Sequence, residues 1–216
     1  MKLQTAIRKR IEKLDRRYVY PIMAKRRARK LKSQSFTIIS NNCWGGRCYD
    51  FFGMQKKTPT VGAYFYAADY VKFCKRLRYY LSLELEIIPT KDSRYYDALL
   101  AKGQQNVLVG RLDDVEIIFL HYHDREVLLD KWKRRIDRID WDRIIIKFSY
   151  QNQCTDELVE EFMEIEEYPK FCLVGEPVTG NKDEIVFRRN RGKETVDEIE
   201  NFNWIIDPIK VLNERL

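Results

Sequence analysis

The residues best suited to chemistry follow a short apolar run near the start of the chain. Phe36 to Ile39 is rich in aromatic and β-branched residues, which favours a buried strand. The run ends in residues that favour turns and helix caps, followed by a thiol, an indole, two glycines and a cation: Ser40, Asn41, Asn42, Cys43, Trp44, Gly45, Gly46 and Arg47. This pattern is typical of a ligand-binding loop. It fits equally a tight strand-to-helix turn with a buried cysteine and a core tryptophan.

Cys43 is the one plausible nucleophile in this loop. His121 or His123 could activate it if either imidazole lies within hydrogen-bond reach, and a helix N-terminus would stabilise the thiolate. The alternative is that Cys43 is a small buried hydrophobe. The two histidines alternate along a predicted strand and would face one side, which suits a metal ion. Together with Cys43 and Cys48, however, they match no standard zinc spacing, so we predict no metal site.

The same loop has the composition of an anion-binding turn. Asn42, Gly45, Gly46 and Arg47 could hold a phosphate or diphosphate through backbone amides and the guanidinium group. The loop contains neither the Walker pattern nor the dinucleotide-binding glycine pattern, so its residues identify no particular cofactor.

Strands that alternate with amphipathic helices follow the loop. We predict further strands at 60–65, 85–89, 106–110, 115–122, 144–148, 171–175 and 184–187, and helices at 67–83, 125–139 and 155–167. This order predicts an α/β fold: a three-layer α/β/α sandwich with a mixed, mainly parallel sheet. Two hairpins, 106–110 with 115–122 and 171–175 with 184–187, would supply its antiparallel pairs. The strand at 115–122 is apolar on both faces and is predicted to be central.

Such a sheet would gather the polar residues at one edge. In open α/β sheets, ligands bind beyond the carboxyl ends of the strands. Three of the predicted strands end in polar residues, so we predict one cleft at these ends. Its catalytic residues would be Cys43, His121 and His123. Its ligand-binding residues would be Ser40, Asn41, Asn42, Trp44, Gly45, Gly46, Arg47, Tyr150 and Asn152.

The positive charge of the chain is concentrated at its N-terminus. The net charge is +7, but residues 1–35 hold 13 lysines and arginines against two acids and carry +11, whereas the other 181 residues carry −4. A nucleic-acid-binding domain would have a basic face of its own, so we predict no nucleic-acid partner.

The first 32 residues have the pattern of a basic amphipathic helix. Ile7, Ile11 and Leu14 recur at helical spacing, Tyr18 continues the stripe, and cations surround it. Such a helix can lie on an anionic membrane surface or dock on a partner protein. We therefore divide the chain into a basic helical extension, 1–35, and a single α/β domain, 36–216.

No apolar run is long enough to cross a bilayer, and the N-terminus lacks the pattern of a secretory signal. The five cysteines are scattered and odd in number, which is typical of reduced thiols. We expect a cytoplasmic protein that can attach peripherally to the inner face of the membrane.

Three stretches together resemble an uncharacterised bacterial family. They are IISNNCWGG at 38–46, TPTVG at 58–62 with the later KRLRYYL at 75–81, and FLHYHDREVLLDKWKRRIDRI at 119–139. The family is classed as a domain of unknown function, and its members are often labelled exopolysaccharide or capsule biosynthesis proteins. The resemblance spans roughly residues 36–212 and leaves the basic N-terminal helix outside. It implies a three-layer α/β fold and a role near surface-polysaccharide assembly, and it supplies no catalytic residues.

These observations lead to the hypothesis of an intracellular transferase, of glycosyl or acyl type, in exopolysaccharide or capsule biosynthesis. Its donor would be a nucleotide-activated sugar or an acyl thioester. Two alternatives stay open: a non-catalytic carbohydrate-binding or scaffolding module of the same machinery, and a Cys-His hydrolase.

Overall fold

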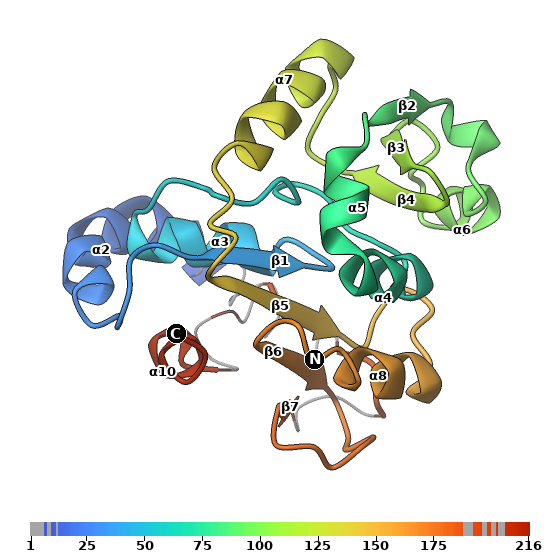
Figure 1. The fold of residues 1–216 in the computed structure, drawn as a ribbon. Helices are drawn as coiled ribbons and strands as arrows, with labels where there is room; N and C mark the ends of the chain where they lie inside the picture. Colours follow the sequence, from blue (N-terminus) through green and yellow to red (C-terminus); the bar gives the residue numbers. More distant parts are fainter. Residues whose placement is uncertain are drawn as a thin grey trace.

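The strands form two separate sheets (Figure 1). The structure is a computed structural model that describes residues 7, 10, 11, 13–187, 192–195, 198, 199, 202 and 206–216. The larger sheet has the order β1-β5-β6-β7, with β1 at Thr37–Ser40, β5 at Ile144–Ser149, β6 at Lys170–Val174 and β7 at Glu184–Val186. The smaller sheet has the order β2-β3-β4, with β2 at Glu86–Ile88, β3 at Leu108–Leu112 and β4 at Val115–Phe119.

Helices cover both faces of the larger sheet. The described helices are α2 (Tyr20–Ala28), α3 (Trp44–Phe52), α4 (Ala67–Lys75), α5 (Leu77–Ser82), α6 (Tyr96–Ala101), α7 (Arg125–Ile136), α8 (Asp156–Met163) and α10 (Pro208–Asn213), with a π-helical turn at Asp15–Val19 and a 3₁₀ turn at Thr90–Asp92. Of these, α6 packs on the smaller sheet. Successive strand residues point to opposite faces. Ile39 and Ile146 pack in the core that includes α4 and α8, whereas Ile38 and Ile145 pack in the core that includes α2, α3 and α10.

The prediction of an α/β fold is confirmed, but the single mixed sheet is not. All three pairings in the larger sheet are parallel, and the antiparallel pairings among the described residues belong to the smaller sheet. The hairpin predicted between 171–175 and 184–187 is wrong because β6 and β7 pair in parallel. The Glu184 carboxylate accepts the amides of Val178 and Thr179, so the connection folds back before β7 begins.

The predicted hairpin at 106–122 is confirmed as β3 and β4, but β4 is not central. It is the last strand of the smaller sheet, and its outer edge is met by Tyr64, whose N–H and carbonyl both bond Ile118. The segment predicted as a strand at 60–65 pairs there alone, because Gly62 bends it with φ of +77°. The Phe65 amide also donates to the Asn41 carbonyl, so this segment links the two sheets.

The predicted helices form at the expected positions, but their lengths differ from those predicted. Asp124 caps α7 as expected, its carboxylate accepting the Val127 amide at 2.9 Å. The helix predicted at 67–83 is broken into α4 and α5 at Arg76, which has non-helical angles. The sequence from Thr195 also predicts a helical tail in two pieces, broken by Pro208. The first piece falls largely outside the described residues, and the second is α10.

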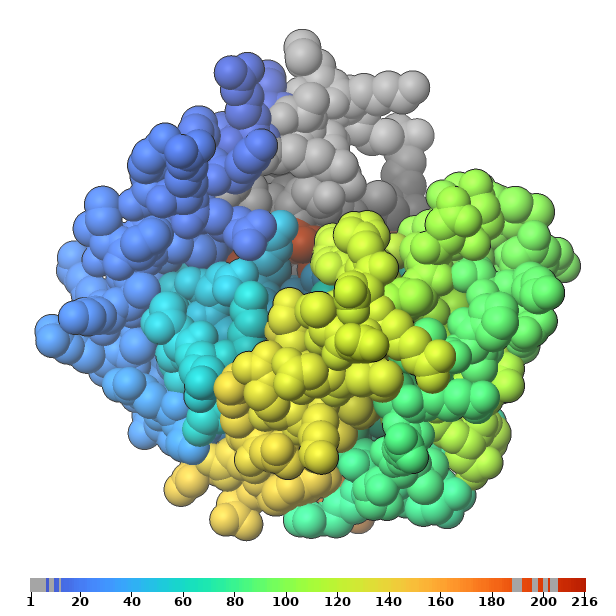
Figure 2. Space-filling model, turned by 90° about the horizontal axis from the view of Figure 1, so that it is seen from above, coloured from blue at the N-terminus to red at the C-terminus, as the bar shows by residue number. Residues whose placement is uncertain are grey.

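The N-terminal helix packs on the body of the protein. Tyr20, Ala24 and Ala28 are buried, and Figure 2 shows the N-terminal segment, in blue, alongside the cyan residues of α3 and its following loop. Pro21 lies in the first turn of α2, where a missing amide is tolerated, so it does not end the helix. Within the described part of the chain, no helix combines the length and the apolar character needed to cross a bilayer.

Candidate functional site

Side chains of β1 and its loop cap the start of α3. The Ser40 hydroxyl accepts the Gly45 amide at 3.1 Å and donates to the Asn42 carbonyl at 2.7 Å. The Asn42 side-chain oxygen accepts the Trp44 amide at 3.1 Å. Cys43 therefore occupies the position just before the helix, ahead of two residues whose amides are already bonded. One of the amides considered for a phosphate cradle, that of Gly45, is thus used inside the protein, and so is the neighbouring amide of Trp44.

Gly45 allows α3 to lie directly against β1. A Cβ added at this position would sit 2.9 Å from the Ser40 oxygen and 3.2 Å from a methyl carbon of Ile38. At Gly46 the added carbon would lie 3.5 Å from Val61, an ordinary contact. The first glycine is therefore required by packing, which brings Cys43 to the carboxyl end of the sheet.

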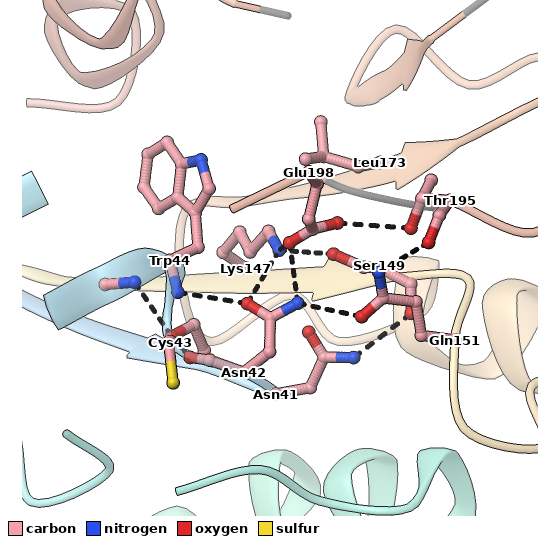
Figure 3. Close-up of polar contacts among 12 residues, drawn as sticks. Asn41, Asn42, Cys43, Trp44, Lys147, Ser149, Gln151, Leu173, Thr195 and Glu198 are labelled. Atoms are coloured by element: carbon pink, nitrogen blue, oxygen red, sulfur yellow. Dashed lines mark hydrogen bonds and ion pairs between the residues drawn. The ribbon is translucent and has the colours of Figure 1, made fainter. Parts of the chain in front are cut away.

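A buried polar network lies beside the loop (Figure 3). The Lys147 ammonium donates to the Asn42 side-chain oxygen at 3.2 Å and also bonds Ser149 and the Glu198 carboxylate. Glu198 also accepts from the Asn42 amide at 2.6 Å and from the Thr195 hydroxyl at 3.1 Å. Lys147 and Glu198 are 0% and 1% exposed, so this ion pair is wholly shielded from water.

The network fixes the position of the loop. Asn42 uses its oxygen for the Trp44 amide and for Lys147, and its nitrogen for Glu198 and Gln151, so each of its polar atoms has a partner. Burial lowers the pKa of Lys147, and the charge of Glu198 opposes this effect. An ion pair without access to water needs such added hydrogen bonds to offset its desolvation.

Cys43 and His121 form a thiol–imidazole pair on the other side of the loop. The Cys43 Sγ lies 3.8 Å from the His121 Nε2, and Figure 3 shows the sulfur pointing away from Glu198. Burial raises the pKa of Cys43, although the charges of Arg47 and Lys147 oppose this effect. Burial, followed by the charge of Arg47, lowers the pKa of His121. Both pKa shifts favour the uncharged forms near pH 7, so the pair consists of a thiol and an uncharged imidazole.

Several of the other predicted residues form their hydrogen bonds with groups outside this pair. The Tyr150 hydroxyl donates to Asp156 at 3.1 Å, toward the start of α8. The Asn152 side chain accepts from Lys102 and donates to the Phe65 carbonyl, joining two loops. His123 is exposed and, because β4 ends at Phe119, the argument that both histidines face one side of a strand does not apply. Asn41 and Trp44 are fully buried.

Sequence reasoning missed Lys147, Glu198, Gln151 and Thr195. A lone lysine inside the apolar strand Ile144–Ser149 was a usable signal, because an amine there needs a buried partner. Nothing local marks Glu198 as that partner. Among the residues that the structure describes, no group of three or more metal-ligating side chains could hold an ion.

The comparisons with known proteins support the resemblance read from the sequence as far as a domain of unknown function. An uncharacterised protein of Haemophilus influenzae is 25% identical over 175 residues, which cover 81% of this chain and 79% of that protein. A family profile described as a domain of unknown function, DUF1919, matches residues 14–213. The match begins earlier than the residue 36 inferred from motifs, so it includes α2 and the turn before it. The chain therefore belongs to the DUF1919 family.

Proposed function

We propose that this protein is a transferase of the acyl type, with Cys43 as nucleophile and His121 as general base. The observation that carries the proposal is the 3.8 Å approach of Cys43 Sγ to His121 Nε2 at the carboxyl end of the parallel sheet. Here the nucleophile is half-buried and the neighbouring base is exposed, and a nucleophile next to a base is the arrangement that covalent acyl transfer requires. The neutral forms favoured by both pKa shifts suit a base that removes the thiol proton during attack.

The proposed reaction has two steps. Cys43 attacks the carbonyl carbon of an acyl thioester while its proton passes to His121. The donor's carbon–sulfur bond breaks, and the leaving thiolate takes the proton from the imidazolium. An acceptor hydroxyl then attacks the acyl-cysteine, gives its proton to His121, and Cys43 leaves and recovers that proton. The charge of Arg47 acts on both Cys43 and His121 and would stabilise the negative charge that develops in each step.

An acyl donor suits the loop better than a nucleotide-activated sugar. A nucleotide-activated sugar carries its diphosphate on the carbon that reacts, so a diphosphate at the start of α3 would need free amides, and those of Trp44 and Gly45 already bond Asn42 and Ser40. In acyl-coenzyme A the diphosphate lies at the far end of the pantetheine arm from the thioester, so it need not bind at this loop. The label that the sequence resemblance carries supports a surface-polysaccharide precursor as the acceptor. We propose that the reaction takes place in the cytoplasm, where acyl thioesters of coenzyme A are available.

The test is release of free coenzyme A from acyl-coenzyme A thioesters, with and without soluble glycans. We expect release in the wild type and none in Cys43→Ser, with donor binding by thermal shift retained. Cys154→Ser is the matched control, because that thiol is also half-buried and lies outside the pair. Full release by Cys43→Ser would refute the proposal. Glycan binding without any turnover would favour a carbohydrate-binding module, and release that needs no acceptor would favour a hydrolase.

A further inference from the structure

The N-terminal helical segment has two opposite apolar faces, and only one is covered. Tyr20, Ala24 and Ala28 pack into the core beside α3, and Tyr20 is 3% exposed. On the opposite face Ile22 is 79% exposed. Of the nine large apolar side chains that are exposed within the described residues, six lie in this segment: Ile7, Ile11, Leu14, Tyr18, Val19 and Ile22. We call these six residues the apolar stripe.

The spacing of the stripe makes it one continuous surface. Ile7, Ile11, Leu14, Tyr18 and Ile22 recur every three or four residues, which is the period of a helix face. Single exposed apolar residues are ordinary, but a contiguous row of them marks an interaction surface. The packing of α2 also holds this row in place, because Arg27 lies over the rings of Phe51 and Tyr20 at 3.9 Å and 4.9 Å.

A cavity of about 640 Å³ opens between the N-terminal segment and the second half of α3, and its lining includes Tyr20 and Ala24 of the covered face and none of the stripe residues. Its charged lining consists of four cations and one carboxylate: Lys13, Arg16, Arg17, Lys56 and Asp50. Asp50 bonds Arg16 at 3.2 Å and Lys56 at 2.9 Å, so the acid also holds two of the cations in place. Cations outnumber acids by three, which makes the cavity a site for an anion.

We infer that the apolar stripe enters an anionic phospholipid membrane and that this cavity binds a lipid headgroup phosphate. An apolar row flanked by arginines and lysines fits the boundary between acyl chains and headgroups. A second copy of the chain would bring its own +11 segment against this one if the stripes paired, and like charges would repel. A lipid surface supplies both the apolar and the anionic partner at once.

The inference does not depend on acyl transfer, since vesicle binding is measured without turnover. The full-length protein should sediment with vesicles that contain phosphatidylglycerol, not with vesicles of phosphatidylcholine alone, and should be released as salt is raised. Tyr18→Ser/Ile22→Ser should weaken binding by about tenfold for each side chain that the membrane fully buries. The matched control is Leu100→Ser/Val127→Ser, which alters two other exposed apolar residues outside this segment and should bind as the wild type does.

The cavity is tested by a lysine that lies outside the helix. Lys56→Gln should weaken binding about fivefold, the value of about 1 kcal/mol for one charge near an anionic surface. Lys75→Gln is its control, because Lys75 forms a similar surface ion pair, with Glu161 at 2.7 Å, away from the cavity. Three results would overturn the inference: equal sedimentation with both vesicles, equal effects of Lys56→Gln and Lys75→Gln, or a dimer in solution that Tyr18→Ser/Ile22→Ser dissociates.

Discussion

Replacing Lys147 with methionine removes the cation of the buried network and leaves Glu198 without its charged partner. Methionine fills the space of the lysine stem, so the change tests charge and hydrogen bonding more than volume. The ammonium bonds Asn42, Ser149 and Glu198, and both members of the ion pair are shielded from water. Breaking a buried pair by removing one partner costs about 3–5 kcal/mol, so the free energy of unfolding of Lys147→Met should fall by this amount.

The assay is equilibrium unfolding in urea, followed by tryptophan fluorescence and far-ultraviolet circular dichroism. Lys72→Met is the control, because Lys72 pairs with Asp114 at 2.8 Å on the surface, where a pair contributes about 0–1 kcal/mol. The double variant Lys147→Met/Glu198→Leu should recover most of the loss, since no unpaired charge then stays buried. If Lys147→Met costs no more than Lys72→Met, the network does not hold the loop as we argue.

Three further predictions concern the loop and its base. Gly45→Ala should destabilise the protein by about 1–3 kcal/mol because its methyl group would crowd Ser40, whereas Gly46→Ala, in the same helix turn, should be neutral or stabilising in the same urea assay. The proton resonances of His121, identified by their loss in His121→Asn, should titrate below pH 6.5. As the pH falls below 6.5, the unfolded chain binds this proton more readily than the folded protein does, so the free energy of unfolding should decrease. Alkylation of Cys43 by iodoacetamide, followed by peptide mass spectrometry, should rise at a more alkaline pH than for a free cysteine, and a profile shifted to acid would contradict the thiol–imidazole pair.

The local parts of the fold could be predicted from the sequence. The strand before Ser40 and the cap at Asp124 follow from residue types within a few positions, and so does the β3–β4 hairpin. Strand pairing was harder, because the parallel alignment of β6 and β7 depends on how Glu184 folds the connection back. The break at Arg76 was also hidden, since the apolar period continues through it.

Part of the candidate site could likewise be predicted from the sequence, and part could not. Cys43 was predicted to lie near His121 or His123 because all three come at the ends of predicted strands, and the structure places the Cys43 Sγ 3.8 Å from the His121 Nε2. The network behind them was not predictable, because Glu198 meets Lys147 from a position 51 residues further along the chain. Tyr150 and Asn152 were placed in the cleft on strand-end position alone, and their side chains instead bond Asp156, Lys102 and the Phe65 carbonyl.

The most direct test of the acyl-transfer proposal is the mass of the intact protein after incubation with acyl-coenzyme A and no acceptor. We expect one added acyl group, located on Cys43 by peptide analysis and discharged by hydroxylamine. Cys154→Ser should form the same adduct, His121→Asn should form it much more slowly, and Cys43→Ser should not form it. An adduct of equal yield on Cys43→Ser, or no adduct with any acyl-coenzyme A while the donor binds, would contradict the role assigned to Cys43.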